Sequence, residues 1–124
     1  MDRRSVVLGG GLAVWVPAIA FAGERENAMY GLISTITAVS GKRDQLIGFI
    51  AGDPSEMPGC ISYVVASDAA DPDRIWVSEV WEGKKAHAAS LELPAVVSNI
   101  EKARPMIAGM KIVAETVPVA TPKA

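Results

Sequence analysis

A histidine and a tryptophan six positions apart are the first candidates for chemistry in this sequence. Trp81 and His87 lie in the stretch EVWEGKKAHAASLELPAV, residues 79–96, and His87 is the only histidine of the chain. An imidazole exchanges protons near neutral pH and serves as a general base or acid. An indole offers a large flat face to an aromatic ligand. The two residues are therefore candidate catalytic residues of a site for an aromatic molecule. The alternative is that both only pack in the core.

The residues around His87 predict where its side chain points. Residues 83–93 have helical spacing, and the side expected to face the sheet carries small residues and one leucine: Ala86, Ala89, Ser90 and Leu93. His87 falls on the flank of this side. Strand alternation places Val77, Glu79 and Trp81 on one common face, towards which the imidazole can point. Small side chains next to a sheet are expected to leave room for an aromatic ligand.

The elements that position these residues follow from periodicity and turn residues. Four strands are predicted at residues 29–40, 60–68, 74–82 and 109–120, and three helices at 41–52, 83–93 and 94–107. Ser40 is expected to cap the first helix, and Pro94 suits a first helical position. This order predicts an α+β fold, in which a four-stranded antiparallel sheet carries its helices on one face. One domain is expected over residues 29–118, followed by a tail over 119–124.

The second and third predicted strands carry apolar residues on both faces. Ile61, Tyr63 and Val65 stand against Cys60 and Val64, and the third strand repeats this pattern with Ile75, Val77 and Trp81 against Trp76 and Val80. A sheet with one face in water alternates apolar with polar residues instead. Helices can cover one face, and we expect a second copy of the chain to cover the other in a symmetric homodimer.

The first twenty-two residues have the pattern of an export signal. Arg3 and Arg4 precede an apolar run, and the segment ends in small residues at Ala20 and Ala22. The paired arginines favour the twin-arginine route, which is a receptor-read address and not an anchor. The run is too short and too interrupted for a comfortable membrane span of about 20 residues. Residues 1–22 are therefore predicted to be a signal peptide, and the protein to be periplasmic or secreted with no membrane span in its mature part.

Composition excludes several classes of function. The chain has a net charge of −2 and no cluster of Lys and Arg, which argues against nucleic-acid binding. Cys60 is the only cysteine, so no internal disulfide can form, and it is read as a small hydrophobic residue on a strand. One histidine and one cysteine do not make an ordinary zinc site. No metal or other cofactor is predicted.

Several segments resemble one known family in order and spacing. GKRDQLIGFI, MPGCISYVVASDAADPD, IWVSEVWEGKKAHAASLELPAV and ARPMIAG are similar to the antibiotic biosynthesis monooxygenase domain, and within it to small proteins described as quinol monooxygenases. The resemblance runs from about Tyr30 to Val117. It implies a dimeric, ferredoxin-like α+β barrel. It also implies oxidation of a quinol or a polyphenolic, polycyclic aromatic substrate by O₂ without metal or flavin.

The resemblance implies a reaction that the substrate itself drives. A phenolic hydroxyl is a weak acid with a pKa of about 10. Neutral His87 would accept or share its proton as it leaves, which as general-base catalysis contributes about 10²–10⁴-fold. The electron-rich anion would reduce O₂ directly, through a caged radical pair and then a peroxide that collapses to quinone and water. Trp81 would stack on the substrate ring.

Four further residues are candidate substrate contacts. Ser90 or Asn99 would donate a hydrogen bond to a developing oxyanion. Arg104, near a helix end, would hold an acidic substituent, although it also suits simple compensation of a helix C-terminus. Tyr63 on the second predicted strand completes the set.

Two other functions remain open at the level of the sequence. The same barrel could be a non-catalytic module that binds a small hydrophobic ligand, and such a module would tolerate the loss of His87. It could also bind or degrade haem, as one branch of the family does. In that case His87 would have to ligate the iron, because the chain has no other histidine.

Overall fold

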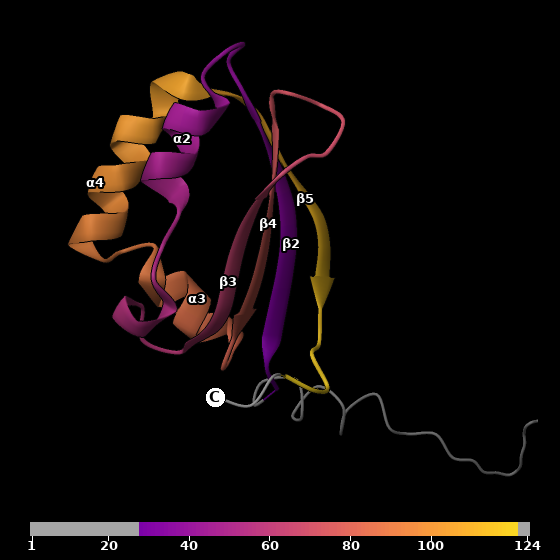
Figure 1. Cartoon of the computed structure of the whole chain (residues 1–124). Helices are drawn as coiled ribbons and strands as arrows, with labels where there is room; N and C mark the ends of the chain where they lie inside the picture. Colours follow the sequence, from indigo (N-terminus) through magenta and orange to yellow (C-terminus); the bar gives the residue numbers. More distant parts are fainter. Residues whose placement is uncertain (1–27, 122–124) are drawn as a thin grey trace, which may run out of the picture.

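The computed structural model describes residues 28–121, which form a sheet with its helices on one side (Figure 1). The elements follow in the order β2 (Tyr30–Ala38), α2 (Arg43–Ile50), η1 (Pro54–Glu56), β3 (Cys60–Ser67), β4 (Arg74–Trp81), α3 (Lys84–Ser90), α4 (Pro94–Ala103), η2 (Arg104–Met106) and β5 (Ile107–Thr116). The predicted signal peptide and the last three residues of the predicted tail lie outside the described residues. Within the described part, no helix is long and apolar enough to cross a membrane.

The sheet has four strands in the order β3-β4-β2-β5, and all neighbours are antiparallel. In Figure 1, α2 and α4 lie side by side over one face, and α3 lies on the same side, next to the end of β4. The predicted α+β class and the ferredoxin-like arrangement of sheet and helices are confirmed. Cross-strand partners share a face, so the register places Tyr30 beside Trp81 and Tyr63 beside Glu79.

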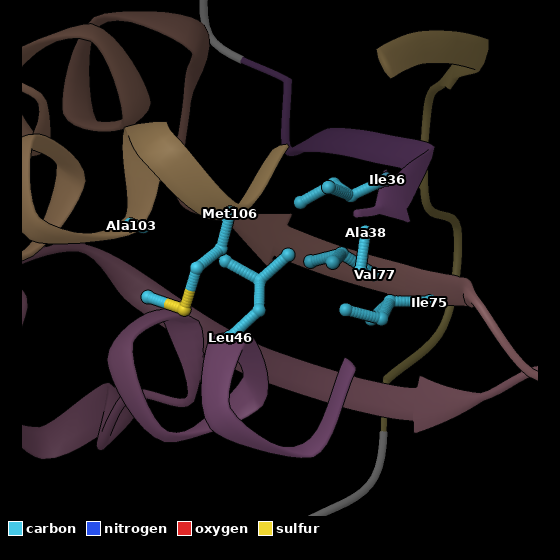
Figure 2. Close-up of a cluster of buried hydrophobic side chains, with 7 residues drawn as sticks. All are labelled: Ile36, Ala38, Leu46, Ile75, Val77, Ala103 and Met106. Atoms are coloured by element: carbon cyan, nitrogen blue, oxygen red, sulfur yellow. The ribbon is translucent and has the colours of Figure 1, made fainter. Parts of the chain in front are cut away.

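The hydrophobic core lies between the sheet and the pair α2 and α4. Leu46 of α2 is fully buried against strand residues, and Ala103 of α4 and Met106 of η2 complete the helix side of the core (Figure 2). The remaining members come from β2 and β4: Ile36, Ala38, Ile75 and Val77. The core therefore fixes the helix layer over one half of the sheet. The other half, at the Tyr30 end of β2, carries Glu79 and Trp81 on β4, and His87 of α3 lies over it.

Local sequence explains some of the element ends, and others differ from those predicted. Pro94 occupies the first turn of α4, as predicted, because its missing N–H is not needed there. The predicted helix 94–107 divides into α4 and η2, and β5 begins at Ile107. Ser40 does not cap α2. Gly41 has a φ of +81° and turns the chain, so that Lys42 takes the N-cap position without a side-chain hydrogen bond.

The sheet face opposite the helices carries both apolar and polar side chains. Val64 is 54% exposed there, and Trp76 is half-buried with its Nε1 donating to Asp68 Oδ2 at 2.7 Å. Their neighbours Val65 and Val77 point to the helix side, as pleating requires. The predicted covering of this face by a second copy stays a prediction.

Candidate functional site

The turn from β4 into α3 brings His87 back over the strand that precedes it. β4 ends at Trp81 and α3 begins only three residues later, at Lys84, with Gly83 in an extended N-cap conformation. His87 is the fourth residue of α3 and faces the end of β4. Its Nε2 is 3.8 Å from Oε1 of Glu79, two residues before the end of the strand.

Two aromatic rings flank the His87 imidazole. The Trp81 ring lies 5.5 Å away, centroid to centroid, with its plane inclined by 69°, and the Tyr30 ring lies 5.6 Å away at 45°. These separations are typical of favourable aromatic pairs. The His87 side chain keeps 19% of its surface exposed, whereas Trp81 as a whole keeps 1%. The imidazole is therefore reachable from solvent, and the indole sits beneath it as a buried support.

Glu79 connects the indole and the imidazole. Its Oε1 accepts a hydrogen bond from Trp81 Nε1 at 2.9 Å, and the same oxygen faces His87 Nε2. The 3.8 Å separation is too long for a direct hydrogen bond but short enough for an ion pair when the imidazole is protonated. Only 11% of the Glu79 side chain is exposed. A fixed, poorly solvated carboxylate therefore stands beside the only histidine.

Tyr30 is the second wall of the imidazole and is itself held in place. Its hydroxyl donates to Glu115 Oε2 at 2.5 Å, and Lys84 Nζ lies 3.9 Å from that oxygen and 5.8 Å from the centre of the Tyr30 ring. Burial, the hydrogen bond to Glu115 and the charges of Glu115 and Glu79 raise the pKa of Tyr30 to about 12. The phenol is therefore neutral over the physiological range.

Tyr63 lies on the other side of Glu79, across the β3–β4 pair. Its hydroxyl donates to the carbonyl oxygen of Ile50 at 2.8 Å, at the end of α2. Burial, followed by the charges of Glu79 and Cys60, raises the pKa of Tyr63 to about 12. Burial also raises the pKa of the Cys60 thiol, and Glu79 adds to this effect. Both groups are neutral neighbours of the carboxylate.

The remaining predicted contacts fall in different places. Ser90 is 5% exposed, and its Oγ donates to the carbonyl oxygen of His87 at 2.6 Å, so its proton is already engaged within α3. Asn99 is exposed on α4. Arg104 begins η2, next to the Ala38 end of β2, whereas His87 lies at the Tyr30 end. The nine-residue strand spans roughly 25 Å between these ends. The structure therefore does not bring Arg104 to the histidine.

The small residues of α3 serve close packing at the point where the helix meets the start of β3. A Cβ added to Gly59 would lie 2.6 Å from the Cβ of Ala86, and Gly59 has a φ of +83°. Glycine and alanine thus let the helix approach the chain more closely than larger residues would. The sequence predicted space for an aromatic ligand beside these small residues, but near Gly59 the helix itself occupies that space.

Three residues of the site carry no role in the sequence interpretation: Glu79, Tyr30 and Glu115. Strand alternation signals that Glu79 shares a face with Trp81, but nothing local links Tyr30 or Glu115 to His87. Among residues 28–121 no group of three His, Cys, Asp or Glu side chains is placed to hold a metal ion. The chemistry that these side chains can themselves perform is proton transfer at an aromatic site, with the imidazole as the mobile proton carrier.

Comparisons with known proteins show which family the chain belongs to. Residues 29–98 match the profile of the family described as antibiotic biosynthesis monooxygenase. A crystal structure from Chloroflexus aurantiacus J-10-fl, provisionally named as a member of that family, is 48% identical, with 77% of this chain and 98% of that chain covered and a TM-score of 0.71. Comparison with curated proteins gave no match.

More distant solved structures share the fold. A protein from Nitrosomonas europaea with the same provisional name is 18% identical, with 75% of this chain and 92% of that chain covered and a TM-score of 0.67. One from Caulobacter crescentus CB15 is 16% identical, with coverages of 82% and 99% and a TM-score of 0.67. Together with the profile match over residues 29–98, the similarity to the Chloroflexus protein shows that the chain belongs to the antibiotic biosynthesis monooxygenase family.

Proposed function

We propose that the protein is a cofactor-independent monooxygenase that oxidises a quinol or polyphenolic aromatic substrate with O₂, using His87 as its general base. Membership of the family supports the reaction type. The observation that carries the proposal is the placement of His87 Nε2 3.8 Å from Glu79 Oε1, an oxygen that the Trp81 indole holds by a hydrogen bond. A base, a carboxylate that stabilises its charged form and an aromatic surround are thus assembled in one place.

The first step is a proton transfer from the substrate hydroxyl to His87. The resulting imidazolium lies next to the Glu79 carboxylate, which stabilises the new positive charge as the carboxylate does in a Ser-His-Asp triad. Because Glu79 is only 11% exposed, its charge is weakly screened by water. Trp81 Nε1 keeps the carboxylate oriented, so little reorganisation is needed when the proton arrives.

The oxidation then proceeds on the substrate. The anion transfers one electron to O₂, and the radical pair combines to form a carbon–oxygen bond and a peroxide. Loss of the hydrogen on that carbon, with cleavage of the O–O bond, leaves a carbonyl and releases the second oxygen atom. The proton held by His87 and the proton from carbon complete one molecule of water. The substrate therefore gains one oxygen and loses two hydrogens.

The aromatic residue that contacts the substrate differs from the one that the sequence predicted. Trp81 is 1% exposed, so it supports Glu79 and His87 from beneath and has little surface on which a substrate ring could stack. Tyr30 is half-buried and flanks the imidazole on another side, so we assign to its ring the contact with the substrate. No observation favours haem ligation, because the Nε2 atom of His87 faces a carboxylate.

Two broader features belong to the same proposal. The apolar residues on the open face of the sheet support a homodimer, with Val64 and Trp76 at its interface. The twin-arginine-like pattern of residues 1–22 supports export to the periplasm. Fractionation of cells that express the full chain, with Arg3 and Arg4 replaced by lysine as the control, tests the export route.

Oxygen consumption by the purified, chelator-treated protein tests the reaction. We expect uptake that scales with protein concentration on a panel of naphthohydroquinones and that falls by about 10²-fold or more in His87→Ala. Lys85→Ala, an exposed substitution on the same helix, is the matched control and should keep full activity. Uptake no faster than autoxidation, or unchanged uptake in His87→Ala, would refute the proposal and favour a ligand-binding module.

A further inference from the structure

The charges around His87 are unbalanced towards the negative side. Glu79 faces the imidazole directly, and within residues 28–121 His87 is the only basic group at ion-pair distance from it. Glu115 lies behind Tyr30, and its charge is matched by Lys84, whose side chain is 75% exposed. With neutral His87, the immediate surroundings of the imidazole are net anionic.

The pKa values of three weak acids near Glu79 show that a negative charge is disfavoured in the surroundings of this carboxylate. These acids are Tyr30 on β2 and Tyr63 and Cys60 on β3, and each has a raised pKa. Burial is the largest cause in every case, and the charge of Glu79 contributes in every case. Both causes act on any anion placed there, because both the lost hydration and the nearby carboxylate disfavour the charged form.

We propose that Glu79 is a specificity-determining residue, which restricts the site to uncharged phenolic substrates and excludes those that carry a carboxylate, sulfonate or phosphate. This inference rests on the proposed function, because it concerns the substrate of the same site. A fixed anionic substituent brings an additional negative charge beside Glu79. The nearest cation, Lys84, is 75% exposed and already faces Glu115, so it compensates this charge only weakly. Arg104 cannot compensate it, since it lies at the opposite end of β2.

The same carboxylate does not oppose the proposed deprotonation of the substrate. The proton moves from the substrate hydroxyl to His87, so the total charge of the site stays constant. The imidazolium then stands next to Glu79, with its Nε2 3.8 Å from the carboxylate oxygen, and balances one negative charge while the substrate anion carries the other. A sulfonate has no proton to give at neutral pH, and its charge is added to the charge of Glu79. The residue therefore favours proton transfer and disfavours anionic ligands for one electrostatic reason.

Binding of two naphthols that differ by one charge tests this inference. The probes are 2-naphthol and 2-naphthol-6-sulfonate, and the readout is the NMR signal of the His87 imidazole in the full chain, which has no other histidine to overlap it. We expect the wild-type protein to bind 2-naphthol about tenfold more tightly than the sulfonate. In Glu79→Gln the sulfonate should bind more tightly, and the ratio should fall to about threefold or less. Glu101→Gln, an exposed change of equal charge on α4, should leave the ratio unchanged.

Each result decides between the inference and its alternatives. Equal binding of both probes by the wild-type protein would overturn the inference without any variant, and so would failure of 2-naphthol to bind. An unchanged ratio in a folded Glu79→Gln protein would overturn the role of this residue. Selective binding of 2-naphthol without any oxygen uptake on hydroquinones would support the inference on selectivity and overturn only the monooxygenase function.

Discussion

Glu79 and His87 lie on different elements, yet His87 Nε2 comes to 3.8 Å from a Glu79 oxygen that already accepts the Trp81 indole N–H at 2.9 Å. One carboxylate oxygen thus links the end of strand β4 to the middle of α3. The hydrogen bond fixes the carboxylate, and the carboxylate in turn faces the imidazole. Substitutions at Glu79 can therefore separate the role of its charge from the role of its hydrogen bond.

Replacing Glu79 by Gln should reduce activity without much loss of stability. The amide oxygen can still accept from Trp81 Nε1, but the charge that stabilises a protonated His87 is gone, so we expect kcat/KM for a naphthohydroquinone to fall roughly tenfold. Replacing it by Leu also leaves the buried indole N–H without an acceptor, which should lower the free energy of unfolding by about 1–3 kcal/mol. Oxygen uptake and urea denaturation measure the two effects.

The two variants check one another. If Glu79→Gln were as unstable as Glu79→Leu, the carboxylate would be needed for folding itself, and the assigned division between charge and hydrogen bond would be wrong. If both variants kept full activity, His87 would not depend on Glu79 during proton transfer.

The sequence predicted the part of this site that depends on local periodicity. Alternation along residues 74–82 places Glu79 and Trp81 on one face, and helical spacing puts His87 on the flank of its helix, so the structure brings the three together. The α+β class followed from the order of elements for the same reason. Local repeats are short-range features, and one chain contains all the information needed to detect them.

The remaining neighbours could not be found in this way, because they depend on strand pairing. Tyr30 and Glu115 are 85 positions apart and meet because β2 pairs with β5, and Tyr30 reaches Trp81 because β2 also pairs with β4. Arg104 shows the converse. Its type suited an acidic ligand, but no local signal said that its helix ends at the far end of the sheet. Ser40 failed as a cap because the left-handed turn at Gly41 moves the helix start beyond its reach.

The two tyrosines should titrate together at high pH. Tyr30 and Tyr63 are the only tyrosines of the chain, and each has a pKa of about 12 in the folded protein against an ordinary value of 10.0. The folded state therefore holds these protons more tightly than the unfolded state. The stability that they contribute is complete below pH 10 and is lost as pH rises towards 12.

Phenolate absorbance in the near ultraviolet measures this directly. We expect the native protein to titrate near pH 12 and the urea-unfolded chain near pH 10. Tyr63→Phe should remove half of the absorbance change, and the loss of stability at alkaline pH should become shallower in that variant. A native titration centred at pH 10 would show that neither phenol is desolvated as the structure indicates.

Gly59 should not tolerate even a single added carbon. Its φ of +83° disfavours any side chain, and a Cβ would meet that of Ala86 at 2.6 Å. We expect Gly59→Ala to lower the free energy of unfolding by roughly 2 kcal/mol and to reduce oxygen uptake, because α3 and its His87 must shift. Gly48→Ala is the control, since a Cβ there meets nothing within 4 Å inside α2, and it should stabilise the protein by up to about 1 kcal/mol.

A charge placed on the open face of the sheet should break the proposed homodimer. Val64 is 54% exposed on that face. In the proposed dimer a second copy covers this position, so the ammonium of a lysine there would be buried without water or a partner. We therefore expect the wild-type protein to sediment as a dimer at micromolar concentration and Val64→Lys to sediment as a folded monomer. Val97→Lys makes the same change at a 39% exposed valine of α4, on the helix layer, and should remain dimeric. A monomeric wild-type protein, or dissociation by Val97→Lys instead, would place the interface elsewhere. In that case the apolar residues of β3 and β4 on this face would need another explanation.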